Sequence, residues 1–187
     1  MSEAEPEAIA IANSNELPRD LIGYPISLKK FILFNVLTLG LFELVWAFKH
    51  FRALKGAGKA KTAAAVVFSL FLPISLFDMM KEYEAVSTEA KSPITFNKYL
   101  LAVIYFAVQA VIKFADRFPS MPEWVPLVAF PIGLIPLIIV QRQVNLLNKT
   151  LRPGIPFAPP MTWKHWLGLA LGIVVLLAML LGAVLLR

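Results

Sequence analysis

The segment from Trp166 to Leu186 contains no charged residue, and it limits what this chain can fold into more than any other feature. At a rise of 1.5 Å per helical residue, such a segment is about 31 Å long, which is enough to cross the hydrocarbon core of a bilayer. A helix buried in a soluble domain rarely needs so many consecutive apolar residues. The segment therefore predicts an integral membrane protein.

The composition points the same way. Hydrophobic residues make up 58% of the chain and charged residues only 16%, whereas globular domains are nearer to about 45–50% and about 25%. The absence of cysteine excludes disulfides, thiol nucleophiles and thiolate metal sites. The net charge of +6 reflects an excess of Lys and Arg, which in a membrane protein is typical of cytoplasmic loops that face anionic lipid. Basic residues are not interleaved with stacking aromatic residues, so we do not expect nucleic-acid binding.

Five apolar segments, separated by polar connections, dominate the chain. They comprise residues 31–48, 62–77, 99–115, 124–140 and 163–186. None of them alternates with a period of two, so we expect helices and a single helical membrane domain over residues 24–187. Residues 1–23 are acidic, unlike the basic start of a secretory signal, and are expected to form a flexible tail.

Local features refine these segments. A break at Thr38-Leu39-Gly40 could let the first segment turn back on itself. The prolines of the fourth segment remove backbone donors, so that helix is expected to be kinked and packed against neighbours. Gly168 and Gly172 permit close approach by another helix. Aromatic residues at the segment edges are expected in the headgroup layer: Tyr24, Trp46, Tyr99, Trp124, Trp163 and Trp166.

The distribution of the 18 Lys and Arg residues discriminates between topologies. If all five segments cross, the two sides of the membrane carry almost equal numbers of cations. If instead the first two segments enter from the cytoplasm and return to it, every cation lies inside except Lys113, Arg117 and Arg187. The second arrangement follows the positive-inside rule. It also relieves the cost of an acid, Glu43, at the middle of the bilayer.

We therefore expect an all-α integral membrane protein with three full transmembrane helices. The first two segments are expected to form a re-entrant or interfacial helix pair on the cytoplasmic side. Five transmembrane helices remain the alternative.

The first segment also carries a motif. Thr38, Gly40, Phe42 and Trp46 follow the pattern Thr-x-Gly-x-aromatic-x-x-x-Trp, and a basic stretch comes next. Together with Tyr24 to Phe31, Asp116-Arg117, Gln143 to Asn148 and a closing glycine-bearing helix, this motif resembles a family of uncharacterised bacterial membrane proteins. The resemblance implies a multi-pass inner-membrane protein and assigns no catalytic residue. Phe42 stands where that pattern is expected to have a tyrosine.

Glu43 is the sharpest candidate for a functional residue. On a helix it shares a face with Gly40, Ala47 and His50, so small residues flank the acid. The functional interpretation of Glu43 and His50 is a proton-linked or cation-binding site within the membrane. The structural interpretation is that Glu43 lies at the interface and pairs with a cytoplasmic lysine.

Two further polar clusters are candidates for headgroup or helix–helix contacts. Lys113, Asp116 and Arg117 can pair along one helical turn, either to fix the depth of a helix or to bind an anion. Gln141, Asn145 and Asn148 share a face, with Arg142 beside them. Such amides hydrogen-bond across helices or to lipid phosphates.

The stretch 49–61 is expected to lie against the anionic inner leaflet. Its cations are Lys49, Arg52, Lys55, Lys59 and Lys61. Near an anionic surface each cation contributes on the order of 1 kcal/mol of attraction.

No H-E-x-x-H, G-x-S-x-G or paired-carboxylate arrangement is present in the sequence. We therefore expect no enzyme, no metal site and no cofactor. The sequence favours an accessory or scaffold protein that binds another membrane protein or lipid, or forms a homo-oligomer. The alternative is an oligomeric carrier or channel for a lipid, an ion or a small hydrophobic solute.

Overall fold

The computed structural model describes residues 22–55, 58–89, 91, 97–118, 120–122, 124–151 and 153, together with short parts of 166–177. Every regular element in these residues is a helix, which confirms the predicted all-α class for this part of the chain. In chain order the elements are α2 (Leu28–Leu37), α3 (Leu41–Lys55), α4 (Lys59–Leu70), α5 (Leu72–Glu89), α6 (Lys98–Phe114), the 3₁₀ helix η1 (Ala115–Arg117) and α7 (Trp124–Leu151).

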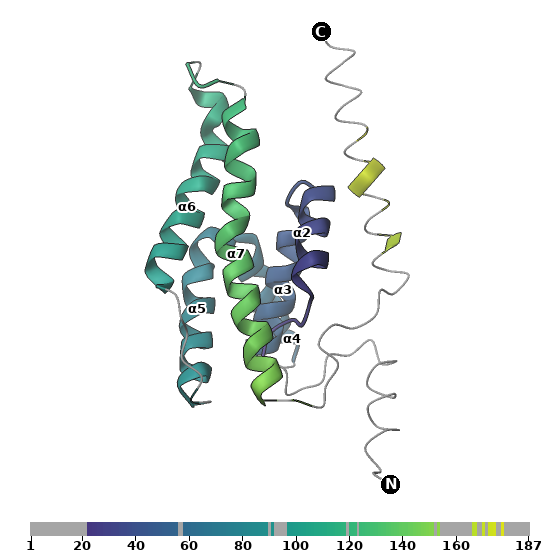
Figure 1. Cartoon of the computed structure of the whole chain (residues 1–187), viewed down its shortest axis with the longest axis vertical. Coiled ribbons are helices and arrows are strands. Elements are labelled where there is room, and N and C mark those ends of the chain that lie inside the picture. The colour runs from purple at the N-terminus through teal and green to yellow at the C-terminus, as the bar shows by residue number, and fades with distance from the viewer. Residues whose placement is uncertain are drawn as a thin grey trace.

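The first apolar segment, residues 31–48, is a helical hairpin and not one helix. Where α2 ends, the backbone N–H of Gly40 donates to the carbonyl of Asn35 at 2.9 Å. Leu39 (φ 49°) and Gly40 (φ 86°) adopt left-handed backbone conformations, which glycine takes at little cost. The chain therefore reverses at this turn, and α3 returns beside α2 (Figure 1).

The second apolar segment, residues 62–77, is divided too. Its break lies at Phe71, between α4 and α5. Pro73 falls in the first turn of α5, where the missing N–H removes no intrahelical bond. The hydroxyl of Ser75 reaches back across the break and donates to the carbonyl of Phe68 at 2.5 Å. One apolar segment of the sequence thus supplies parts of two helices.

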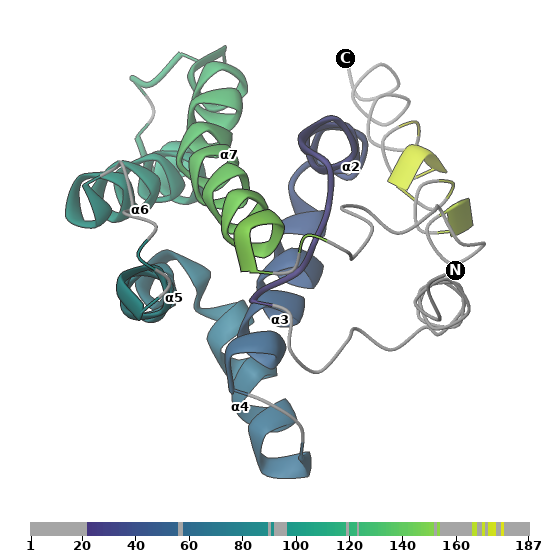
Figure 2. The same cartoon turned by 60° about the horizontal axis from the view of Figure 1, so that its bottom comes forward.

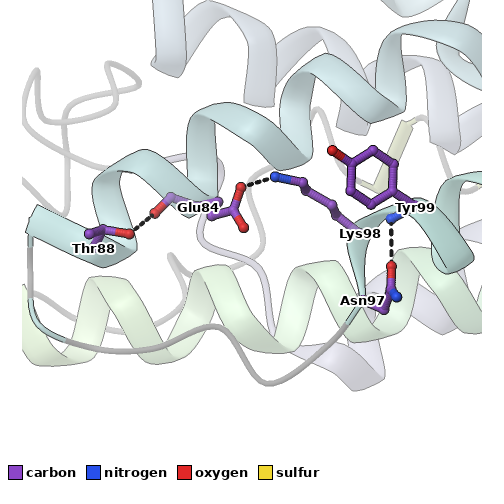
Figure 3. Close-up of polar contacts among 5 residues, drawn as sticks. All are labelled: Glu84, Thr88, Asn97, Lys98 and Tyr99. Carbon is purple, nitrogen blue, oxygen red and sulfur yellow. Dashed lines mark hydrogen bonds and ion pairs between the residues drawn. The ribbon is translucent and has the colours of Figure 1, made fainter.

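Polar contacts cap the start of α6 and join it to α5 (Figure 3). Asn97 caps α6, because its side-chain oxygen accepts from the backbone N–H of Tyr99 at 3.0 Å. Lys98 forms an ion pair with Glu84 of α5, and this hydrogen bond raises the pKa of Lys98. The Lys98 ammonium also lies 5.2 Å from the centroid of the Tyr99 ring.

Helix α7 has 28 residues and is therefore about 42 Å long. Among the described residues it is the one helix that is long and apolar enough to cross a membrane. Pro131 and Pro136 lie inside it, as the sequence predicts for the fourth segment. Gly133 allows close packing on α6, since a Cβ there would lie 3.0 Å from a methyl of Val108.

Three helices extend beyond the apolar segments that predict them. The sequence predicts polar connections over residues 49–61, 78–98 and 141–162, but α3, α5 and α7 continue into them. The helices extend further than the apolar segments because Lys, Glu, Gln and Leu form helices well whether or not the segment is apolar. Each of these three helices therefore continues past the point where its apolar residues end.

The hydrophobic core joins α2, α3, α5, α6 and α7, and Ala65 of α4 also belongs to it. Its largest fully buried side chains include Trp46, Tyr83, Tyr105, Phe31 and Phe51. Tyr24 and Trp46 belong to this core, so their expected place in an aromatic belt was wrong. Tyr99, Trp124 and Trp166 are exposed, whereas Trp163 lies outside the described residues.

The connections between the helices lie toward the two ends of the molecule. In Figure 1 the α2–α3 turn and the α6–α7 connection lie toward the upper end, and the last turns of α5 and α7 lie toward the lower end. The α2–α3 turn does not reach as far up as the α6–α7 connection. Among the described cations, Lys113 and Arg117 belong to the upper end.

The surface of α6 and α7 is unusually apolar. Its exposed large hydrophobic residues include Leu100, Val103, Phe106, Val111 and Phe114 of α6 and Leu127, Val128, Ile132 and Ile135 of α7. Large exposed apolar surfaces mark membrane or protein contacts.

Most of the terminal apolar segment, residues 163–186, lies outside the described residues, as does the acidic tail except Ile22 and Gly23. One described position of that segment is informative. Gly172 packs against the end of α2, since a Cβ there would lie 2.8 Å from the methyl of Thr38 and 3.0 Å from the Leu37 carbonyl oxygen. Glycine at this position therefore permits the close helix approach that the sequence suggests.

Candidate functional site

Three amides on one face of α7 bind the extended segment that precedes α2, and we call them the amide ladder: Gln141, Asn145 and Asn148. Gln141 Nε2 donates to the carbonyl of Tyr24 at 3.1 Å. Asn145 Nδ2 donates to the carbonyl of Ile26 at 2.9 Å. Asn148 makes two bonds to the backbone of Ile22, each 2.9 Å long. The amide ladder thus fastens residues 22–26 along α7.

The hydrogen-bond roles of Gln141 follow from its partners. Its Nε2 donates to the Tyr24 carbonyl and, at 2.8 Å, to Asn145 Oδ1. Its Oε1 accepts from the indole N–H of Trp46 at 2.5 Å and lies 3.1 Å from His50 Nε2. Because an amide oxygen can only accept, the proton of His50 must reside on Nε2.

The other ring nitrogen of His50, Nδ1, then has to accept a hydrogen bond. It forms a short hydrogen bond with the hydroxyl of Tyr83 on α5, which must be the donor. Hydrogen bonds therefore connect five buried side chains, which we call the buried polar network: Trp46, His50, Tyr83, Gln141 and Asn145. It joins α3, α5, α7 and the segment before α2.

Gly23 packs directly against this network. Its φ of 76° is a left-handed conformation. A Cβ at this position would overlap the Tyr83 hydroxyl and lie 2.8 Å from His50 Nδ1. Glycine is therefore required both by the backbone and by the space.

Burial keeps the imidazole of His50 neutral. The side chain is 0% exposed, and this desolvation lowers its pKa from 6.5 to about 3, against a smaller opposite effect of the bond to Gln141. A second ring proton would also displace the bond donated by Tyr83. The network is thus built around one protonation state.

Glu43 forms a separate polar contact, with α6. Its Oε2 accepts from the hydroxyl of Tyr105 at 2.6 Å and from Gln109 Nε2 at 3.5 Å. The residue is only 7% exposed, and no ion pair reaches it from any described lysine or arginine. The lysine partner considered from the sequence is not present among these residues. The carboxyl group is held by neutral donors.

Glu43 and His50 share a face of α3, as their spacing predicts, but the structure does not unite them in one site. Glu43 faces Tyr105 and Gln109 on α6, whereas His50 faces Tyr83 and Gln141. Sequence reasoning missed all three partners on α5 and α6. The spacing of Tyr105 and Gln109, four residues apart on an apolar helix, is the one signal that could have indicated them.

The cluster at the end of α6 is only partly described. Lys113 is exposed in the last turn of α6. The Arg117 guanidinium lies 5.3 Å from the centroid of the Phe114 ring. The side chain of Asp116 lies outside the described residues, so the expected pair with Lys113 does too.

The remaining candidate cations lie mostly on the surface. Arg142 is exposed on α7, away from the amide ladder. The Lys49 ammonium lies 4.0 Å from the centroid of the Tyr24 ring, and that of Lys55 lies 4.4 Å from the Phe68 ring. Three more are exposed around the α3–α4 turn: Arg52, Lys59 and Lys61.

Asn35 is the one buried side chain of the described part with an unmatched polar atom. Its Nδ2 donates to the Phe31 carbonyl at 2.9 Å, but its Oδ1 has no hydrogen-bond partner. In the same part of the chain, no group of three or more His, Asp or Glu side chains gathers in a way that could hold a metal ion.

No family model matches this chain, and neither the curated proteins nor the solved structures include a similar protein. The geometry of the described residues is therefore the basis for assigning a role.

Proposed function

We propose that the chain is a polytopic protein of the bacterial inner membrane with a non-catalytic role, as an accessory or scaffold that binds another membrane protein or lipid. The buried polar network carries this proposal. Every polar group of Gln141 is used to connect parts of its own chain, and so are both ring nitrogens of His50. Such use fixes one packing arrangement and offers no group to a substrate.

The proposed topology has α6, α7 and the terminal apolar segment crossing the membrane. The α2–α3 hairpin enters from the charged side and returns to it, and so do α4 and α5. The left-handed turn at Leu39 and Gly40 supports the first return, and the break at Phe71 supports the second. The apolar exposed surface of α6 and α7 supports their contact with lipid.

The proposed partners include anionic lipid headgroups at the α3–α4 turn. The five candidates do not contribute equally. Lys49 and Lys55 lie over aromatic rings of the same chain, which leaves Arg52, Lys59 and Lys61 as the cations most open to a headgroup. This distinction was not available from the sequence.

One observation favours the alternative, a carrier or channel built from an oligomer. Glu43 is a buried carboxyl group with neutral donors and without an ion pair in the described residues. Ionisable side chains placed in a membrane in this way often belong to ion or proton pathways.

Replacement of Glu43 by Gln separates the two functions. For a scaffold, liposomes with the purified protein show no proton or cation flux above empty liposomes, measured with an entrapped pH dye and a potential-sensitive dye. The variant then differs from wild type in abundance or in oligomeric state on native gels. Tyr105→Phe is the matched control, because it removes the donor and keeps the acid. A wild-type flux that Glu43→Gln abolishes, with expression unchanged, would establish the carrier instead.

A further inference from the structure

Helix α4 touches the other described helices through a narrow stripe. Its buried residues are Ala65 and Ser69. Phe68 adds a ring contact with Phe51 of α3, at 5.2 Å between centroids. Figure 2 shows α4 beside α3 and projecting away from α6 and α7. Most of the α4 surface therefore remains uncovered.

The uncovered surface of α4 changes from charged to apolar along the helix axis, and not from one side of the helix to the other. Lys59 and Lys61 are exposed in the first turn. The far end of α4, the break and the start of α5 expose Val66, Val67, Leu70, Phe71 and Ile74, with the last three between 58% and 66% exposed. A helix that lies flat on a membrane has a charged face and an apolar face along its whole length. The axial change fits a helix with one end in the headgroups and the other in hydrocarbon.

All charged residues in the part of the sequence that contains α4 are basic. No Asp or Glu occurs between Glu43 and Asp78, whereas five Lys and Arg residues do. Arg52, Lys59 and Lys61 are exposed near the same turn. A surface of this kind is complementary to anionic phospholipid headgroups.

We infer that α4 is a tilted membrane wedge that binds the anionic leaflet, with Lys59 and Lys61 among the phosphates and Phe71 in the hydrocarbon. The ten residues from Lys61 to Phe71 span about 15 Å along a helix. That length is half of a hydrocarbon core about 30 Å thick. Because the helix is tilted and begins among the phosphates, the wedge enters one leaflet and ends before the midplane of the bilayer. This inference rests on the proposed membrane role and specifies the lipid and the element that binds it.

Depth measurements on α4 test the wedge. The native chain has no cysteine, so single variants Ala63→Cys, Val67→Cys and Phe71→Cys can each carry an environment-sensitive fluorophore in reconstituted bilayers. A tilted wedge gives quenching by iodide that falls from position 63 to 71 and quenching by spin labels at the lipid chain end that rises. Equal depth at all three positions would show a flat helix, and no lipid quenching at any of them would show a protein partner. Either result overturns the inference.

The anionic preference is tested by comparing spin-labelled phosphatidylglycerol with spin-labelled phosphatidylcholine as quenchers of the label at position 63. The ratio of the two quenching constants is expected to fall about five-fold for each cation removed in Lys59→Gln/Lys61→Gln. Lys113→Gln/Arg117→Gln removes the same charge at the other end of the molecule and should leave the ratio unchanged. An equal fall in both variants contradicts a local site.

A label at Val103→Cys on the exposed face of α6 separates failure of the wedge from failure of the membrane role. If position 103 is quenched by lipid and α4 is not, only the wedge is wrong. If neither is quenched, the proposed membrane role fails as well.

Discussion

Gly23 shows how one missing side chain can determine the packing around it. The atoms that a Cβ would meet come from three helices: the Tyr83 hydroxyl, His50 Nδ1 and a methyl of Val144. All three lie far from Gly23 in the sequence, so the requirement for glycine is invisible without the structure. The sequence indicates only that a turn is possible there.

Gly23→Ala is expected to destabilise the protein by about 2–4 kcal/mol. This figure combines the cost of a left-handed backbone with that of overpacking a filled site. Thermal unfolding in detergent measures the effect. Gly58→Ala is the control, since Gly58 also has a positive φ but a Cβ there would meet nothing within 4 Å. If both variants lose the same stability, backbone strain alone accounts for the loss at Gly23.

The neutral His50 makes a specific pH dependence expected. Its pKa in the folded protein, about 3, lies below the ordinary value of 6.5, so the unfolded chain binds the extra proton first as the pH falls. Its contribution is fully present above about pH 6.5 and decreases as the pH falls toward 3. At pH 5 the loss is about 2 kcal/mol.

Denaturant unfolding at pH 7 and pH 5 measures this loss. His50→Gln should reduce the difference between the two pH values, although it lowers stability at both. An unchanged difference in the variant would mean that other groups cause the acid sensitivity.

Glu43 shows where residue-level prediction stops. Its burial on α3 could be predicted from its flanking small residues. Its donors Tyr105 and Gln109 are 62 and 66 residues away, and no local pattern specifies which helix packs on that face. Trp46 was misplaced for a related reason. An indole at the edge of an apolar segment fits a headgroup layer, but here Gln141 satisfies its N–H inside the core.

At the scale of elements, the amide ladder holds the segment before α2 against α7. Residues 22–26 form no helix, so their backbone groups depend on side chains for partners. Asn145 donates a hydrogen bond to the Ile26 carbonyl and accepts one from Gln141. The first hairpin is therefore held at its base by α7.

Asn145→Leu is expected to release this segment. The Ile26 carbonyl would lose its partner inside the protein, at a cost of about 1–3 kcal/mol. Hydrogen–deuterium exchange should become faster in residues 22–26 and stay the same in α6. Arg142→Leu, on the exposed side of α7, is the matched control. Equal exchange in the two variants would show that the ladder is not what holds the segment.

One element break was predicted from the sequence, whereas another break and several helix ends were not. The turn at Leu39 and Gly40 lies where the sequence indicates a break, because glycine is the residue that tolerates such a backbone. The break at Phe71 was not predicted, although Pro73 next to it is a local signal that could have indicated it. By contrast, the ends of α5 and α7 lie in polar sequence, because helix formation and membrane affinity are different properties of a residue.

At the scale of the whole molecule, the unequal distribution of exposed cations between the two ends is the feature on which the proposed orientation depends. The α3–α4 turn collects exposed cations, and the α6–α7 connection has Lys113 and Arg117 near it. In the topology that we propose, the positive-inside rule places the α3–α4 turn in the cytoplasm. In that orientation both early apolar segments return to the side from which they enter.

Cysteine labelling in intact cells tests this topology most directly, since the native chain contains no thiol. Ala57→Cys in the α3–α4 turn should react with a membrane-impermeant maleimide only after the cells are opened. Phe118→Cys, next to η1, should react in intact cells. Labelling of Ala57→Cys from outside would contradict the returning hairpins and leave five crossings as the arrangement of this chain.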